Sequence, residues 1–316
     1  MAGGMPHEVP SRAVDTVATV SRFEQLALRD EALPQAVSTP RGQLLKWIGN
    51  KQRLAPEILS YFPPTYGTYF EPFLGSGGVL ATLAPPTAFA SDAFAPLIEI
   101  WQALHDAPET LKGWYADRWN RMMAAEDRVA GYASIRDSYN LSPNGADLVF
   151  LCRACYGGVV RFRKRDGYMS TPCGPHRPIS PEVFAHRVDE WRTRTRGTRF
   201  ERTDYQTAMR QAQAGDLVYC DPPYRHSQAI LYGAQDFSFT ELLGAVRECK
   251  ERGVYVALSI DGIKRTGAEV TQLPLPRDLF EREVFVDCGR SMLKRFQRGG
   301  SSVEDHRVAD RLLLTY

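Results

Sequence analysis

The amino-acid sequence predicts an α/β fold around a parallel sheet, interrupted by a mostly helical insert. Short β-prone runs alternate with helix-prone runs over residues 68–105 and again over 216–260, which is typical of βα units in a parallel sheet. Residues 107–199 break this alternation. The chain has 316 residues, 43% of them hydrophobic. That length suits either one large α/β domain with a smaller insert or two modest domains.

The first block of expected elements surrounds a glycine-rich turn. The sequence GSGG at 75–78 follows a β-prone run and precedes a helix-prone run, so we expect a strand, a tight turn and a helix. A second strand ends at Ser91-Asp92, and a helix follows from Pro96. The expected elements are a helix over 52–61, strands over 68–70 and 88–90, and helices over 79–84 and from 96 to about 105.

The insert and the second block complete the expected fold. The insert reads as helical to about Asn140 and then as a stretch rich in Cys, Gly, Arg and Pro. Residues 1–40 read as a flexible extension with room for a short helix near 19–32. The remaining expected elements are a strand over 216–220, a helix over 240–252, a buried strand over 254–260, and a closing hairpin pair over 280–286 and 311–316.

Composition narrows the class of protein. The sequence shows neither a secretory signal nor an apolar run of about 18 residues, which a membrane-spanning helix needs. Its 6 cysteines include only one close pair, which favours a reducing, cytoplasmic setting. The net charge of +2 says little about partners, but RFRKR at 161–165 and RTRTRGTRFER at 192–202 are strongly basic. Either run alone is more often a solvated face than a phosphate-contacting surface.

The glycine turn and Asp92 together indicate a nucleotide-like ligand. Backbone at Gly75 and Gly77 can approach a ligand closely because glycine has no Cβ, although this turn lacks the Lys-Ser/Thr of a P-loop and the third glycine of a dinucleotide fingerprint. Asp92 stands 17 residues after Gly75 at a strand end. A carboxylate there can bind ribose hydroxyls or cap the next helix, and the nearby glycine turn favours ribose.

The segment Asp221-Pro222-Pro223-Tyr224 carries the strongest local signal. It follows a hydrophobic strand, and ligands of open α/β sheets bind at the carboxyl ends of strands. The Asp221 carboxylate and the Pro222 carbonyl form an acceptor-only pair that suits an exocyclic amine, and Tyr224 offers a face for base stacking. A rigid turn is the alternative. Upstream, the KWIGNK segment at 46–51 reads either as a surface loop or as a ligand lid.

Three motifs in order resemble the DNA adenine methyltransferase family, the Dam-like or D12 class. They are KWIGNK at 46–51, EPFLGSGG at 71–78 and DPPY at 221–224, and the resemblance extends over about 41–316, with Asn50 in place of a family glycine. The family implies a seven-stranded, Rossmann-like, S-adenosylmethionine-dependent fold with an inserted target-recognition domain. The implied domains are 41–106 with 200–316 for catalysis and cofactor binding, and 107–199 for DNA recognition.

The resemblance implies methyl transfer from S-adenosyl-L-methionine to N6 of adenine in double-stranded DNA, with the base flipped out of the duplex. It leaves open a cognate restriction enzyme as partner and implies no metal, since Cys152-x-x-Cys155 lacks a second pair. The expected catalytic residues are Asp221, Pro222 and Tyr224. The expected cofactor residues are Trp47, Lys51, Glu71, Phe73, Gly75, Gly77, Asp92, Asp204 and Asp221. The expected DNA-binding residues are Tyr156, Arg161, Arg163, Lys164 and Arg165.

Two alternatives to this assignment remain open on the sequence alone. One is a methyltransferase that acts on RNA or protein, because an acceptor-only pair suits any planar amine or amide. The other is a DNA-binding protein that keeps the fold without catalysis. The intact DPPY and glycine turn argue against the second alternative, and the basic runs argue against a protein substrate.

Overall fold

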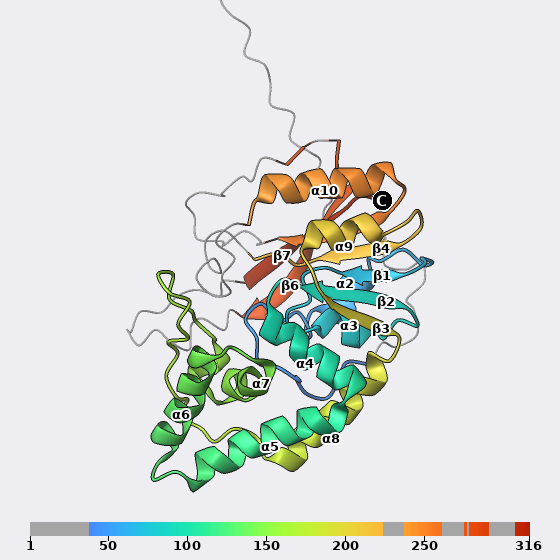
Figure 1. Ribbon diagram of the computed structural model, residues 1–316. Helices are drawn as coiled ribbons and strands as arrows, with labels where there is room; N and C mark the ends of the chain where they lie inside the picture. Colours follow the sequence, from blue (N-terminus) through green and yellow to red (C-terminus); the bar gives the residue numbers. More distant parts are fainter. Residues whose placement is uncertain (1–37, 224–236, 261–274, 277, 291–306) are drawn as a thin grey trace, which may run out of the picture.

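The computed structural model describes residues 38–223, 237–260, 275–276, 278–290 and 307–316. Within these residues a seven-stranded sheet has the order β3-β2-β1-β4-β5-β7-β6 (Figure 1). The strands are β1 (Tyr69–Glu71), β2 (Ala88–Asp92), β3 (Thr198–Arg202), β4 (Leu217–Cys220), β5 (Tyr255–Ile260), β6 (Arg282–Arg290) and β7 (Arg307–Leu314). The expected seven-stranded α/β sheet is therefore confirmed. The helix considered for 19–32 lies outside the described residues.

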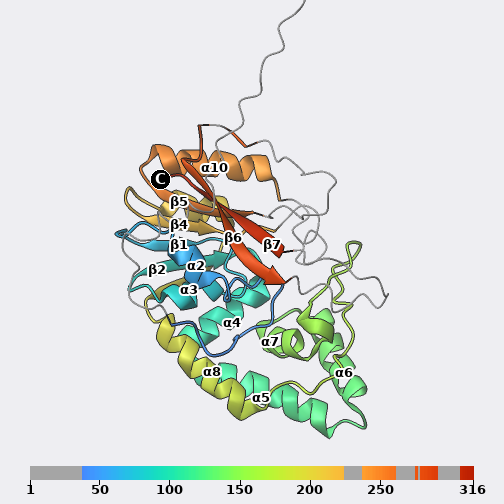
Figure 2. The same cartoon turned by 180° about the vertical axis from the view of Figure 1, so that it is seen from behind.

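Both faces of the sheet are buried, and successive side chains along a strand lie on opposite faces. On β4, Leu217 and Tyr219 belong to one buried cluster, whereas Val218 and Cys220 belong to the other, as the period of two of a strand requires. Figures 1 and 2 show the helices on the two faces. One face carries α9 (Tyr205–Gln211) and α10 (Phe239–Glu251). The other carries α2 (Ala55–Leu59), α3 (Gly78–Leu83) and α4 (Ala95–Asp106).

The carboxyl ends of the parallel strands form one edge of the sheet. Strands β1 to β5 are parallel, and the chain reverses its direction of winding between the neighbours β1 and β4. Such a switch point is where open α/β sheets bind ligands. Strand β7 runs antiparallel to β5 with Arg311 opposite Ile260, and it pairs with β6 as the closing hairpin predicts. The turn at 75–78, Asp92 and Asp221 thus share this edge.

The stretch between α4 and β3 is helical and packs on α4. Its helices are α5 (Pro108–Ala124), α6 (Arg128–Leu141), α7 (Gly145–Ala154) and α8 (Pro181–Arg194), of which the sequence indicated only the first two. The buried carboxylate of Asp147 on α7 accepts from Arg118 Nε on α5 at 2.9 Å and from Ser138 Oγ on α6 at 2.9 Å. Gly145 N donates to Glu99 Oε2 of α4 at 2.6 Å, which fixes α7 against the sheet.

A β-hairpin follows α7, after the single turn η1 (Tyr156–Gly158). Phe162 and Met169 form an antiparallel bridge, and Arg163 N donates to Tyr168 O at 2.9 Å. We call residues 159–171 the basic hairpin. In Figure 1 it rises in light green from the helices α6 and α7. This hairpin is formed by the run of Gly, Arg and aromatic residues in which the sequence gave no clear secondary-structure signal.

Two elements near the second basic run differ from the sequence prediction. Residues 198–202 form the edge strand β3, and residues 205–211 form α9, although the basic run gave no strand signal. Strand β3 pairs in parallel with β2, with Thr198 opposite Ala88. Within β3 only Thr198 and Phe200 are buried. The polar residues of this edge strand, two of them arginines, obscure the alternation of apolar residues by which a strand is usually found in a sequence. None of the described helices is long and apolar enough to span a membrane.

Candidate active site

The turn after β1 holds its two glycines in left-handed backbone. Gly75 has φ of 48° and Gly77 has φ of 61°, a region that glycine adopts without steric cost. A Cβ at Gly77 would lie 2.7 Å from the Trp101 ring, so packing within the protein explains that glycine. Gly75 faces Trp47, whose Cδ1 would lie 3.4 Å from an added Cβ. Trp101 Nε1 also donates to Gly75 O at 3.2 Å, which fixes the turn.

Asp92 ties this turn to the end of β2. Its Oδ2 accepts from Gly75 N at 3.1 Å and its Oδ1 accepts from Phe94 N at 3.0 Å. Burial raises the pKa of the Asp92 carboxyl, while these backbone N–H groups oppose the rise. The N-cap of α4 is Phe94 and receives no side-chain cap, so Asp92 does not cap that helix. The carboxylate lies beside the glycine turn, as ribose binding requires.

The first and third motifs meet at the carboxyl end of β4. Lys51 Nζ lies 2.8 Å from Asp221 Oδ1 and 3.6 Å from Asp310 Oδ2. The Lys51 side chain is 7% exposed, and the two carboxylates are 17% and 16% exposed, so all three charges are largely shielded from water. Pro222 is buried directly after Asp221. Tyr224 lies outside the described residues.

Glu71 is enclosed below this group, at the end of β1. It is 3% exposed, Tyr69 Oη donates to its Oε2 at 2.6 Å, and the backbone N–H of Leu80 on α3 also donates to it. Burial raises the pKa of Glu71 to about 8, with the negative charge of Asp221 adding to the rise. The protein therefore holds Glu71 protonated at neutral pH, and its described partners are protein groups.

The other residues expected to bind the cofactor lie near the same edge. Trp47 packs beside Phe94 with ring centroids 6.2 Å apart. Phe73 stacks on Tyr205 at 5.0 Å. Asp204 is exposed and caps α9, since its carboxylate accepts from Thr207 N at 2.8 Å. Asp204 follows the end of β3, so it is separated from Asp92 by one strand position in the sheet.

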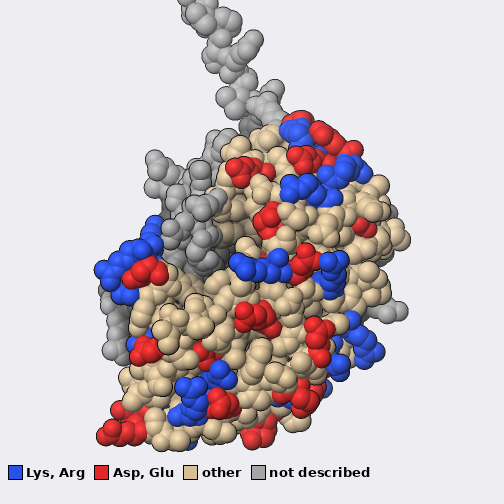
Figure 3. All heavy atoms as spheres, in the orientation of Figure 1, with Lys and Arg blue, Asp and Glu red and all other residues tan. Residues whose placement is uncertain are grey.

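The basic hairpin presents the expected DNA-binding residues at the surface. Arg163 lies over the Tyr168 ring at 4.1 Å and pairs with Asp166 at 3.0 Å, so its guanidinium is held in place. Arg161, Lys164 and Arg165 are exposed. Figure 3 shows blue atoms gathered at the left margin of the molecule, where Figure 1 places the hairpin. Tyr156, at the start of η1, is 47% exposed.

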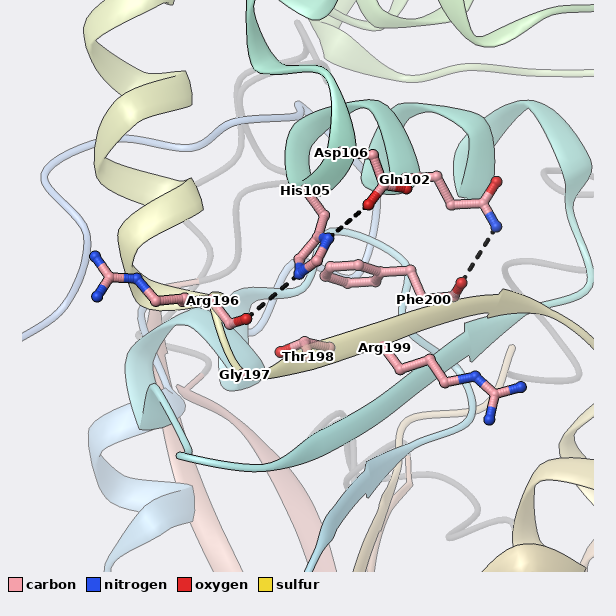
Figure 4. Close-up of a pocket in the computed structure, with 8 residues that line it drawn as sticks. All are labelled: Gln102, His105, Asp106, Arg196, Gly197, Thr198, Arg199 and Phe200. Atoms are coloured by element: carbon pink, nitrogen blue, oxygen red, sulfur yellow. Dashed lines mark hydrogen bonds and ion pairs between the residues drawn. The ribbon is translucent and has the colours of Figure 1, made fainter.

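The second basic run has a different environment. Arg194 Nη1 donates to Ser38 O at 2.6 Å, Arg202 Nε donates to Ala93 O at 3.4 Å, and Arg199 pairs with Glu201. These guanidinium groups bond to the protein's own backbone and carboxylates. A shallow pocket of about 410 Å³ lies beside this run, with His105 and Phe200 in its wall (Figure 4). It opens at Thr198, the amino end of β3, so it lies at the opposite sheet edge from Asp92.

Two features of the site have no local sequence signal. Asp310 comes from β7, 259 residues after Lys51 in the chain, and only the antiparallel pairing of β7 with β5 brings it to the carboxyl edge. Arg153 on α7 is 6% exposed and donates to Gln43 O at 2.8 Å and Leu44 O at 3.0 Å. It fixes the segment before the KWIGNK motif. A charged residue within an apolar closing strand is the one hint that Asp310 offers in the sequence.

Among the described residues, no group of three or more His, Cys, Asp or Glu side chains could hold a metal ion. The observed chemistry is instead a Cβ-free turn, a carboxylate beside it at Asp92, and an ion-paired carboxylate at Asp221 that precedes two prolines. Such a site can hold a nucleoside-like group and present an acceptor to an amine.

Known proteins with similar sequences include a type II methyltransferase, M1.LlaDCHI, of Lactococcus lactis subsp. cremoris, 26% identical over 235 residues, which are 68% of this chain and 79% of the relative. The DNA adenine methylase of Serratia marcescens is 30% identical over 189 residues, 57% of this chain and 66% of the relative. The retron Ec67 DNA adenine methylase of Escherichia coli is 27% identical over 188 residues, 57% of this chain and 63% of the relative.

A solved rRNA methyltransferase, AviRa of Streptomyces viridochromogenes, aligns with 84% of this chain at 14% identity and a TM-score of 0.31, a score too low to establish a shared fold. The model of the D12 class N6 adenine-specific DNA methyltransferases matches residues 47–286. That range is well over half of the chain and includes the glycine turn, Asp92 and Asp221. On this match and on the site that it encloses, the chain belongs to the D12 class of N6 adenine-specific DNA methyltransferases.

Proposed function

We propose that this chain transfers a methyl group from S-adenosyl-L-methionine to N6 of an adenine that is flipped out of double-stranded DNA. The observation that carries the proposal is the position of Asp221. Its carboxylate lies at the carboxyl end of β4, fixed by Lys51 at 2.8 Å, beside the strand β1 that leads into the glycine turn. An amine acceptor and a nucleoside-binding turn therefore share one edge of the sheet.

The residues around the turn fit the proposed cofactor. Gly75 has a positive φ and no Cβ, so the backbone can approach a flat ligand next to the Trp47 indole. The Asp92 carboxylate would accept from the ribose hydroxyls, and Phe73 with Tyr205 would line the side of the pocket. Bound there, S-adenosylmethionine supplies a methyl group on a positively charged sulfur, which an indole face also attracts.

The chain's own groups would orient the adenine amine. Asp221 and the Pro222 carbonyl accept the two N6 hydrogens, which turns the nitrogen lone pair toward the methyl group. Lys51 holds one oxygen of Asp221 in place through a charge-assisted hydrogen bond. From the sequence, Tyr224 would stack on the flipped base. Removing the base from its duplex stack is necessary because the exocyclic amine must reach this recessed acceptor.

We assign DNA binding to the stretch 107–199, and in particular to the basic hairpin. Three of its basic side chains are exposed, at 161, 164 and 165, and exposed cations are what phosphate contacts need. Arg163 is oriented by Asp166 and Tyr168, so it suits a directional contact such as a guanine edge. Tyr156 is an exposed aromatic between the hairpin and α7, which suits stacking on an opened base step.

The test is transfer of labelled methyl groups to duplex DNA, to tRNA and to protein by the full chain. We expect label in duplex DNA at N6 of adenine. Asp221→Asn should remove at least about 99% of the rate, because it changes an acceptor oriented toward the reacting amine. Asp278→Asn is the matched control, since Asp278 is an exposed aspartate paired with Arg247. Label in tRNA or protein but not DNA would contradict the proposal, as would full activity of Asp221→Asn.

Two further assignments are proposed. Cys152, Cys155, Cys173, Cys220 and Cys249 are free thiols, which supports a reducing compartment such as the cytoplasm. A cognate restriction enzyme is a proposed partner because one relative is a type II methyltransferase. If so, expressing this chain should protect host DNA from one endonuclease specificity, and mapping methylated adenines would identify the sequence. Methylation at a site that no tested endonuclease cuts would argue against that partner.

A further inference from the structure

A carboxylate from the last strand of the sheet belongs to the group around Asp221. Strand β7 runs antiparallel to β5, and Arg311 lies opposite Ile260, the last residue of β5. Asp310 therefore stands one residue beyond the carboxyl end of β5, level with the active-site edge. On its other side it pairs with Val286 of β6. The backbone of Asp310 is thus paired with β6, and that of its neighbour Arg311 is paired with both β5 and β6, which orients the side chain.

Asp310 and Asp221 share the ammonium of Lys51. Lys51 Nζ is 2.8 Å from Asp221 Oδ1 and 3.6 Å from Asp310 Oδ2. Each of the three side chains is less than one-fifth exposed, so the charges interact more strongly than at a surface. Both carboxylates therefore interact with the same ammonium group. Without Asp310, the part of the Lys51 charge that Asp310 offsets would act on Asp221.

We propose that Asp310 is a positioning residue for methyl transfer, acting through Lys51 on the orientation and basicity of Asp221. This inference rests on the proposed function. The N6 lone pair forms the new N–C bond while the S–C bond of the methyl donor breaks and its electron pair stays on sulfur. N6 then holds one proton too many, which passes to Asp221 and on to water. Asp310 offsets the charge of Lys51 and so keeps Asp221 able to accept hydrogen bonds and this proton.

The other groups that face Asp221 do not substitute for Asp310. Glu71 of β1 is held protonated by burial, and Tyr69 donates to it. Tyr219 of β4 is close enough to respond to the charges of Asp221, Glu71 and Asp310, but burial raises its pKa well above the usual range. Its hydroxyl bonds to Ser259 of β5 at 2.9 Å. Among the described residues around Lys51, Asp310 is therefore the second carboxylate that pairs with the ammonium.

The sign of the expected pH effect follows from charge. Replacing Asp310 by Asn removes a negative charge, which lowers the pKa of both Asp221 and Lys51. A unit charge at 3.6 Å from Lys51 Nζ shifts the pKa of that lysine by roughly one unit even at the dielectric constant of water. The basic limb of the pH profile of the single-turnover rate should therefore move to lower pH by about one unit. The acidic limb should move in the same direction, and the maximal rate should fall. A residue that only supports the fold would lower the rate without moving the profile.

The experiment measures single-turnover methylation of duplex DNA against pH for wild type, Asp310→Asn and Asp310→Glu. Glu283→Gln is the matched control, because Glu283 pairs with Arg311 at 2.6 Å on the same two strands. We expect wild-type profiles for Asp310→Glu and Glu283→Gln, and the shifted profile for Asp310→Asn. Calorimetric affinity for S-adenosylmethionine should change less than about three-fold in Asp310→Asn, since the effect belongs to the chemical step.

An unshifted profile in Asp310→Asn, or an equal shift in Asp310→Glu, overturns the inference. If Asp310→Asn does not fold, Asp310→Ser and Asp310→Ala take its place, since each also removes the charge. A profile shifted to lower pH in either then supports the inference, and an unshifted profile refutes it. A wild type that methylates no adenine would instead refute the proposed function, so the two failures are distinguishable.

Discussion

Asp92 offers the sharpest test of the proposed cofactor site. Its two carboxylate oxygens accept from Gly75 N at 3.1 Å and Phe94 N at 3.0 Å. In Asp92→Asn, an amide NH2 group replaces one oxygen and must face one of these N–H donors. Losing one hydrogen bond to a charged acceptor costs about 1.5–3 kcal/mol. Asp92→Ala removes both bonds along with any contact to a ribose.

We expect this cost to appear mainly in cofactor affinity, because the Gly75 turn is the part of the pocket that Asp92 orders. A cost of about 1.5–3 kcal/mol is about a 10-fold to 150-fold rise in the dissociation constant. The assay is calorimetric titration with S-adenosylmethionine, together with kcat at saturating cofactor. The dissociation constant should rise at least 10-fold by this estimate, with Asp92→Ala weaker than Asp92→Asn, and kcat should change much less.

Asp127→Asn provides the control, because Asp127 also accepts from a backbone N–H, that of Ala130, at 2.8 Å. That aspartate caps α6, away from the carboxyl edge of the sheet. The Asp127→Asn variant should have at most a slightly lower free energy of unfolding, and its cofactor affinity should equal that of wild type. If Asp92→Ala binds the cofactor as tightly as wild type, Asp92 neither contacts the ribose nor orders the Gly75 turn for cofactor binding, and the ribose assignment is wrong.

Three other results are expected. Asp221→Ala should lose at least about 100-fold in methylation rate yet bind DNA as wild type does, since phosphate contacts lie elsewhere; weakened binding in a gel-shift titration would contradict this. Because the pKa of Glu71 is about 8 in the folded protein, ionisation of Glu71 in the unfolded chain lowers the free energy of unfolding of the wild type as the pH rises from about 4.5 to about 8. Glu71→Gln lacks this loss, so its free energy of unfolding in urea, relative to that of wild type, should be a few kcal/mol higher at pH about 8.5 than at pH about 5. A difference that does not change with pH would refute this expectation. Alanine at 161, 164 or 165 should each flatten the salt dependence of DNA affinity by about one unit of slope, whereas Arg121→Ala on α5 should not.

Local sequence patterns predicted every strand of the described sheet except β3, because those strands are short hydrophobic runs with clear ends. The Gly75 turn, Asp92 and Asp221 were placed together from one rule, that parallel strands end at a common edge. The family match confirms the expectation of a DNA adenine methyltransferase. Helix α7 escaped prediction for a physical reason. It buries side chains on more than one side, Phe150 and Cys152 for example, so no amphipathic stripe marks it. Helix α8 does bury a single stripe, Phe184, Val188 and Trp191, which the sequence prediction did not register.

Roles that depend on distant partners escaped prediction as well. Glu71 was expected in the cofactor pocket, but its described partners are the Tyr69 hydroxyl and the Leu80 amide. Asp310 contacts Lys51 only because the last strand returns antiparallel to the carboxyl edge. Both residue types were visible in the sequence, but Lys51 and Leu80 lie on other segments than Asp310 and Glu71, and only Tyr69 lies on the same strand as its partner Glu71. Pairing across a sheet is set by topology, which local patterns do not contain.

The two basic runs differ in how many of their cations bond to the protein itself, although both expose some of them, Arg192 and Arg196 in the second run for example. In the basic hairpin, cations at 161, 164 and 165 face solvent. In the second run, Arg194 instead bonds to the backbone of Ser38. Arg153 and Arg187 likewise donate to Gln43 O, at 2.8 Å each. Buried carbonyls need donors, and here arginines of α7 and α8 supply them to the chain just before the KWIGNK motif.

That arrangement links the helical stretch to the chemistry. The segment held by Arg153 and Arg187 leads within a few residues to Lys51, whose ammonium contacts Asp221 and Asp310. Helices that carry the basic hairpin therefore also fix the backbone that presents Lys51. The arginines therefore have two environments: those at 161 and 165 face solvent, where we propose phosphate contact, and Arg153 and Arg187 hold the backbone that leads to Lys51.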